Sequence, residues 1–383
     1  MKSYPRIERS MVVPAGLIVL GIMVACGDSG SQKSHEGTLN GLEDSGAGPV
    51  VFQPSNLPAD ICNTATTTDL TVPAGQSVSM NTDQDCDRVI PQGPGLQDIC
   101  VRIYSTIKIA GTYVANEGSR AGAIVATKSF TLESGGELAL TWPGEALGVE
   151  PRPGADARGN GTKGSSGATG GGGGGQMTSA GAPGGNSGGA GGPQYGDPTG
   201  RQLIGGGYGG AGGPAARPTS PLAIPGAPGA AMQIVACGDL ASAGTINATG
   251  SDGGHGDYSP EWAGGGAGGG AGGMILIEAA KVTASGGKIL ARGGNGGPGG
   301  PVVWGGSVLL YGGSGGRGGT GASPPTAGEN GQTSQPPMPP NQSSGAGGGG
   351  GAVGRILINV PQGTSPVLTG VEIDPPAIIG ITH

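Results

Sequence analysis

The chain has 383 residues, of which 90 are glycine and 32 proline, whereas only 12% are charged and 3% aromatic. So few large side chains exclude a single large globular core, and the absence of a strict Gly-X-Y period excludes collagen. The net charge is −7, and the 19 basic residues are scattered along the chain. This charge pattern disfavours both nucleic-acid binding and electrostatic attachment to anionic lipid.

Residues 1–25 are typical of an export signal, in which a basic start precedes an apolar stretch. The basic residues are Lys2, Arg6 and Arg9. The apolar stretch, residues 11–25, is shorter than the ~20 residues of a typical membrane span. It ends in Met-Val-Ala before Cys26, which resembles a bacterial lipobox with Met in the position usually held by Leu.

We therefore predict a lipoprotein signal peptide, with Cys26 as the site of lipid attachment. The alternative is an ordinary secretory signal followed by a coincidental cysteine. Gly27, rather than aspartate, follows the cysteine. This favours the outer membrane, where the protein would face the periplasm or the cell surface. The membrane, contacted through the lipid, is thus the first expected partner.

Residues 26–49 are small, polar and charged, which predicts a flexible tether. Residues 50–142 contain the least glycine and several alternating apolar stretches, so we expect an N-terminal β cap and the first coils of a repeat structure there.

Residues 143–231 form a glycine-rich, low-complexity insertion with almost no apolar periodicity. A long disordered loop is one interpretation. The other is a polyglycine-II-type helix with three residues per turn, whose small faces allow close packing. For the similar glycine run before residue 355, we expect Gly348→Ala to be mild unless Gly348 has a positive φ.

Residues 232–360 contain short apolar strands, such as residues 274–277 and 355–358, each preceded by a glycine run. The first of these strands is apolar at every position, which predicts a strand covered on both faces. A corner of the form Ser-small-Gly-x-aliphatic occurs three times and ends at Leu138, Ile246 and Ile289. We expect Ile275, Ile277, Ile289, Ile356 and Ile358 to lie on stacked strands. Residues 361–383 would form a C-terminal tail or cap.

This pattern of glycine run, apolar strand and Ser-Gly-Gly corner resembles the glycine-rich predicted surface lipoproteins of myxobacteria over roughly residues 100–360. It is more distantly similar to the glycine-rich domains of the PE-PGRS proteins. The resemblance implies a right-handed, β-helix-like fold. The predicted fold class is therefore all-β: an irregular right-handed parallel β-solenoid with long glycine-rich loops, which could be of polyglycine-II type, and a disordered N-terminal segment.

Beyond Cys26, the chain contains Cys62, Cys86, Cys100 and Cys237, an even number that suggests disulfides in an exported protein. Three pairings are open. Pairing among the first three is favoured over a pair with Cys237, which follows an apolar run and would also fit a buried free thiol. The spacing does not match a Cys-x-x-Cys metal site.

No recognisable catalytic motif is present, and we expect no metal or cofactor site. His255 lies in a glycine-rich loop without a second histidine nearby. The main function predicted is a structural, adhesive or matrix role at the cell surface, without catalysis. Extracellular polysaccharide or other surface proteins would then be further partners.

The alternative function is a carbohydrate-binding or polysaccharide-degrading β-helix protein, which would require clustered acids or basic residues on one face. The candidate residues for such a site are Glu133, Glu137, Glu278, Lys281 and Arg292.

Overall fold

The computed structural model describes most of the chain beyond residue 51. The described residues are 52–140, 160–164, 169–175, 179–186, 188–196, 199–213, 223–257, 263–304, 307–310, 313–319 and 344–382. The chain divides into two units, Met1–Pro49 and Val50–His383. The predicted signal peptide, lipid site Cys26, tether and disordered segment all lie outside the described residues.

The larger of two mainly parallel sheets has nine strands in the order β1-β4-β6-β8-β10-β14-β17, with β3 beside β4 and β15 beside β10. The strands are β1 (Leu70–Val72), β3 (Arg88–Ile90), β4 (Ile99–Ile109), β6 (Ala121–Leu132), β8 (Ala231–Ser242), β10 (Met274–Ser285), β14 (Arg355–Pro361), β15 (Val367–Thr369) and β17 (Ile378–Thr382). Only β3 pairs antiparallel to its neighbour.

The smaller sheet has six short strands in the order β16-β11-β9-β7-β5-β2. They are β2 (Ser77–Asn81), β5 (Thr112–Glu117), β7 (Glu137–Ala139), β9 (Thr245–Asn247), β11 (Lys288–Leu290) and β16 (Glu372–Asp374). A separate antiparallel pair joins β12 (Val302–Trp304) to β13 (Ser307–Leu310), and the one helix among the described residues is the 3₁₀ turn η1 (Ile61–Asn63).

The repeated corner sequences place equivalent residues in register, as predicted. Leu138 pairs with Ile246, and Ile246 pairs with Ile289, across three strands of the smaller sheet. In the larger sheet Ile275 pairs with Ile356 and Ile277 with Ile358. Ile275, Ile277, Ile289, Ile356 and Ile358 therefore lie on paired parallel strands, as expected, but not in neighbouring coils of a solenoid.

Apolar side chains cover both faces of the long strands. Ile275 and Ile277 belong to a buried cluster that joins the two sheets, whereas Met274 and Leu276 belong to a second cluster on the outer face of the larger sheet. All four side chains are almost completely buried. The continuous apolar run therefore does mark a strand covered on both faces, as its sequence predicts.

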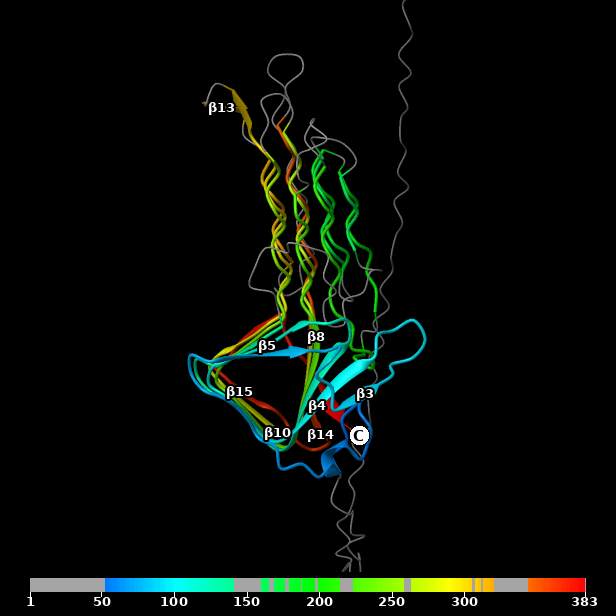
Figure 1. The fold of residues 1–383 in the computed structure, drawn as a ribbon, viewed down its shortest axis with the longest axis vertical. Coiled ribbons are helices and arrows are strands. Elements are labelled where there is room, and N and C mark those ends of the chain that lie inside the picture. Colours follow the sequence, from blue (N-terminus) through cyan, green and yellow to red (C-terminus); the bar gives the residue numbers. More distant parts are fainter. Residues whose placement is uncertain are drawn as a thin grey trace, which may run out of the picture. The chain divides into compact units, whose positions relative to one another are not determined.

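Glycine-rich segments connect β7 to β8, β9 to β10 and β11 to β14, and Figure 1 shows them running side by side away from the sheets. The segment 264–273 is typical. Its N–H groups donate to three neighbouring segments in turn with a period of three residues, and its carbonyls accept from three others. The donors' partners lie in residues 248–257, 207–213 and 346–352, and the accepted bonds come from residues 294–300, 171–174 and 226–229.

A period of three is that of an extended helix with three residues per turn. Because neighbours surround such a segment on all sides, side chains are excluded from most positions. A Cβ added at Gly268, for example, would lie 1.9 Å from the carbonyl oxygen of Gly172. The described glycine-rich segments, hereafter the glycine bundle, are thus hydrogen-bonded structure, which agrees with the polyglycine-II-type interpretation and not with a long disordered loop.

The predicted β-solenoid is wrong, because the strands belong to two distinct parallel sheets of nine and six strands. A solenoid requires coils of similar size, each returning directly to the next strand. Here the chain instead leaves the sheets after β7, β9 and β11 and enters the glycine bundle before it returns. Local strand and corner patterns were correct, but they could not show where the intervening glycine-rich segments go.

Candidate functional site

The segment that enters the described structure, residues 52–63, lies across the outer face of the larger sheet. We call it the strap. Its apolar side chains Phe52, Leu57 and Ile61 are 7%, 5% and 0% exposed and belong to the outer-face cluster with Val235, Leu276 and other strand residues. Burial of side chains of this size contributes about 1.5–3 kcal/mol each. The strap is therefore packed structure and not part of a loose tether.

A disulfide fastens the strap covalently. Cys62 is bonded to Cys237 on β8, with a Cα–Cα distance of 5.6 Å and a sequence separation of 175 residues. The second disulfide joins Cys86 to Cys100, only 14 residues apart. The prediction of a local pair is thus confirmed for these two, whereas the suggestion that Cys237 is a free thiol is wrong. The apolar run before Cys237 is the strand that the strap covers.

The other end of the strap is held by Glu278 on β10, whose side chain is fully buried. Ser55 donates to it twice, from its backbone nitrogen to Oε2 at 3.0 Å and from Oγ to Oε1 at 2.5 Å. Gln233 Nε2 donates to Oε2 at 2.5 Å, and Asn359 Nδ2 donates to Oε1 at 2.9 Å. Strands β8, β10 and β14 and the strap thus meet at one carboxyl group.

These four donors are all neutral, so Glu278 is compensated by hydrogen bonds rather than by an opposite charge. Hydrogen bonds to a charged acceptor are stronger than neutral ones, and a buried carboxylate without them is very unfavourable. Gln233 Oε1, also buried, has no hydrogen-bond partner among the described residues. The arrangement suits a structural anchor for the strap, because each carboxylate oxygen is already occupied by two donors.

The strap and the loop between β3 and β4 also hold a turn that lies between two segments of the glycine bundle. Asn56 Nδ2 donates to the carbonyl of Gly200 at 3.1 Å. Gln92 binds the backbone of Leu203 in both directions, with Nε2 to O at 3.0 Å and N to Oε1 at 2.6 Å. Leu203 is buried in the same outer-face cluster. The strap and this loop therefore connect the N-terminal entry and the larger sheet to a turn within the glycine bundle.

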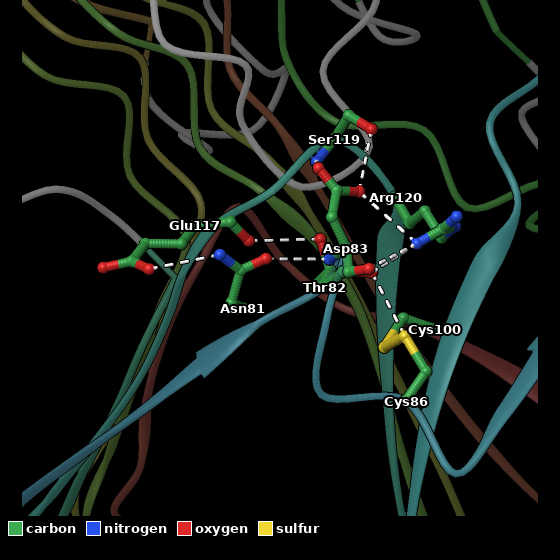
Figure 2. Close-up of polar contacts among 8 residues, drawn as sticks. All are labelled: Asn81, Thr82, Asp83, Cys86, Cys100, Glu117, Ser119 and Arg120. Carbon is green, nitrogen blue, oxygen red and sulfur yellow. Dashed lines mark hydrogen bonds and ion pairs between the residues drawn. A yellow bond between two sulfur atoms is a disulfide. The ribbon is translucent and has the colours of Figure 1, made fainter.

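A polar turn closes the N-terminal end of the sheets, beside the second disulfide (Figure 2). Asp83 accepts hydrogen bonds from both the backbone nitrogen and Oγ of Ser119, each at 2.9 Å. Arg120 Nη1 donates to the carbonyls of Thr82 and Asp83 at 3.3 and 3.1 Å. Glycine is required at position 118, directly before Ser119 and Arg120. Its φ is +89°, and a Cβ there would lie 2.5 Å from Thr82 Oγ1.

The acids of this turn alternate along the chain as Asp83, Asp85 and Asp87, a pattern that could suggest a cation site. In the structure they are used by the protein itself. Asp85 accepts from the backbone of Asn81 and Asp87 from that of Ile103, both at 2.7 Å. No group of three or more His, Cys, Asp or Glu residues suited to a metal ion is found among the described residues.

The structure does not bring the five candidate catalytic residues together. Glu133 forms an ion pair with Lys108 at 2.9 Å, Glu278 is buried under the strap, and Lys281 is exposed on β10. Arg292 binds two acids of β16, and the half-buried Glu137 lies on β7. Within the described part of the chain, no hydrogen bond or ion pair joins any two of the five. His255 Nδ1 lies 3.2 Å from the neighbouring carbonyl oxygen of Gly256.

The largest charged cluster on the smaller sheet joins β11 to β16. Glu372 accepts from Lys288 Nζ at 2.9 Å and from Arg292 Nη2 at 2.6 Å, and Arg292 also binds Asp374. The hydrogen bond from Lys288, followed by that from Arg292, lowers the pKa of Glu372 below its usual value. The hydrogen bond to Asp374 raises the pKa of Arg292. The cluster fastens the last strand of this sheet.

Glu278 was a candidate from the sequence for a carbohydrate site, but in the structure it is buried and holds the strap. Its position directly after a run buried on both faces was the signal that could have indicated burial. Ser55, Gln233 and Asn359 were missed, since nothing local marks them as its partners.

In the ranges that the structure describes, no helix is long and apolar enough to cross a membrane. Comparisons of the chain with protein-family models, with curated proteins and with solved structures found no match.

Proposed function

We propose that this protein is an exported, lipid-anchored, glycine-rich surface protein with a structural, adhesive or matrix role and no catalytic activity. It would be attached to the outer membrane through a lipid on Cys26, after removal of a signal peptide comprising residues 1–25. Its partners would be that membrane and extracellular polysaccharide or other surface proteins. The resemblance of its repeats to glycine-rich lipoproteins of myxobacteria agrees with this role.

The observation that carries the proposal is the fastened strap. The disulfides Cys62–Cys237 and Cys86–Cys100 support a location in an oxidising compartment outside the cytoplasm. The strap joins the chain that follows Cys26 to the middle of the larger sheet by one covalent bond and by the hydrogen bonds of Glu278. Such a connection suits a body that is held to a surface by its N-terminus.

A structural or adhesive role is also supported by how the polar groups are used. The buried carboxyl group of Glu278 and the acids of the polar turn all bind protein donors, and the glycine bundle is held by its own backbone. Side chains that act as caps and anchors stabilise shape. Surface proteins that bear load or bind matrix require a stable shape more than a reactive group.

The test is metabolic labelling with palmitate in a bacterial host that processes lipoproteins, followed by detergent phase separation. The natural chain should be labelled and should enter the detergent phase, whereas Cys26→Ser should do neither. The double variant Cys86→Ser/Cys100→Ser is the matched control, because it removes two cysteines but should keep the label. Label on Cys26→Ser, or none on the natural chain, would contradict the lipid anchor.

A further inference from the structure

Large apolar side chains are exposed only at the ends of the sheets, among the residues whose side chains the structure describes. They lie on β2 and β3 at one end and on β15 and β17 at the other. They are Val78, Val89, Val367, Ile378, Ile379 and Ile381, with exposures from 37% to 56%. Isolated exposed apolar residues are ordinary, but their confinement to terminal strands indicates that these strands have an unfilled neighbouring position.

Within each sheet, apolar residues that pair from one strand to the next form columns through the core. Some of these columns continue to the exposed positions. In the larger sheet one column passes through Ile124, Ile234, Ile277 and Ile358 to Ile379, by direct register. The first four are almost completely buried, whereas Ile379 is 49% exposed. In the smaller sheet the column of Ile246, Leu138 and Tyr113 ends at Val78. Ile379 and Val78 are therefore the last members of core columns, whereas Val367 pairs with Thr283, which is only half-buried.

The two ends present corresponding strands. At the N-terminal end, β3 and β1 lie on the first and second halves of β4, and β2 ends the smaller sheet. At the C-terminal end, β17 lies on residues 357–361, the last part of β14, β15 lies on the last part of β10, and β16 ends the smaller sheet. Each end thus has three short strands whose outer edges are unpaired among the described residues.

Four of these six edge strands lack the usual protection, whereas β3 contains Arg88 and β16 contains Glu372 and Asp374. Proteins commonly place charged residues or proline on an edge strand to prevent pairing with another chain. Strands β1, β2, β15 and β17 contain neither. An occupant of either end must supply strand edges and apolar side chains in two sheets at once, and the opposite end of another copy of this chain does so.

We propose that copies of this protein associate head to tail, with the β15–β16–β17 end of one copy against the β1–β2–β3 end of the next. The contact is between two different surfaces, so it does not close on itself in a pair and can extend into a filament. This inference goes beyond the proposed function and does not depend on the lipid anchor. It gives the protein a means of forming a surface layer from its own copies.

Sedimentation velocity of the full-length chain over a concentration series tests the proposal. The natural chain should form species above the 36.5 kDa monomer whose average mass rises with concentration. Ile379→Lys and Val78→Lys should each weaken association about a hundredfold, because each buries an unpaired charge in the contact. Ile379→Thr and Val78→Thr, which retain strand propensity, should weaken it by about tenfold.

Mixing the two lysine variants gives the sharper result. Val78→Lys retains an intact C-terminal end and Ile379→Lys an intact N-terminal end, so an equimolar mixture should form heterodimers that do not grow. Only folded variants can complement each other in this way. Ala241→Lys is the matched control, since Ala241 is exposed on β8 in the middle of the sheet and should have no effect.

Two results would overturn the inference. A natural chain that stays monomeric at all concentrations would show that the ends are covered by another part of the chain or do not bind. Association that is lost in Ile379→Lys but unchanged in Val78→Lys would indicate pairing of β17 with itself in a symmetric dimer.

Discussion

At the scale of single residues, the glycine bundle is governed by contact distance. A Cβ at Gly348 would lie 1.9 Å from the carbonyl oxygen of Ala267 and 2.9 Å from the backbone nitrogen of Gly268. Both atoms belong to a neighbouring segment that is itself hydrogen-bonded on several sides. Gly348 does not have a positive φ, so the backbone conformation alone does not oppose an alanine at this position. The effect of Gly348→Ala depends instead on whether the segment containing Ala267 and Gly268 can move away from the added methyl group.

We therefore predict that Gly348→Ala destabilises the protein by about 1–3 kcal/mol, the usual cost of overpacking a close-packed region. The measurement is denaturant unfolding combined with limited proteolysis of the bundle. Ser314→Ala is the control, because Ser314 is exposed on a neighbouring segment and already carries a Cβ. Equal stability of Gly348→Ala and the natural chain would show that the segments can separate without cost.

At the scale of elements, the charged cluster that joins β11 to β16, hereafter the clamp, predicts that the stability of the protein depends on pH. Glu372 has a lowered pKa in the folded protein, chiefly because Lys288 and then Arg292 donate hydrogen bonds to its carboxylate. The unfolded chain therefore binds a proton more readily than the folded one. The stabilisation from Glu372 is fully present above its usual pKa of 4.5 and is lost as the pH falls through the lower, folded value.

Unfolding free energy measured from pH 7 down to pH 3 should show this contribution. Glu372→Gln should be less stable than the natural chain at neutral pH and should approach it as the pH falls through the lowered pKa of Glu372 in the folded protein. Lys288→Met removes the main cause of the lowered pKa and should reduce the same pH dependence. Because the group is exposed, added salt should diminish the difference. Parallel pH curves for the natural chain and Glu372→Gln would contradict the role of this clamp.

The sequence was informative wherever a short pattern determines a local structure. The corners ending at Leu138, Ile246 and Ile289 indicated strands in register, and the apolar run before Glu278 indicated a strand buried on both faces. The sheet arrangement could not be deduced, because the glycine runs are nearly identical and any of them could neighbour any other. The strap site depends on contacts such as Ser55 to Glu278, which are 223 residues apart and have no local signature.

At the scale of the whole molecule, the two disulfides close loops of very different size. Cys62–Cys237 spans 175 residues, which include β1 to β7 and part of the glycine bundle, whereas Cys86–Cys100 spans 14. In the chain-entropy account, a crosslink stabilises by restricting the unfolded chain, and the effect increases with loop length. The expected contributions are about 5 kcal/mol for the long loop and about 3 kcal/mol for the short one.

We predict that Cys62→Ser/Cys237→Ser lowers the free energy of unfolding more than Cys86→Ser/Cys100→Ser does, as measured by denaturant unfolding. It should also make the strap more sensitive to proteolysis between residues 52 and 63, since Glu278 and the apolar side chains would then hold the strap alone. The second double variant is the matched control, because it loses the same number of crosslinks but leaves the strap attached. The contrary result would be that Cys86→Ser/Cys100→Ser is the less stable variant and that the strap stays protected in Cys62→Ser/Cys237→Ser. The packing of Phe52, Leu57 and Ile61 would then be sufficient to hold the strap on the sheet, without the long-range disulfide.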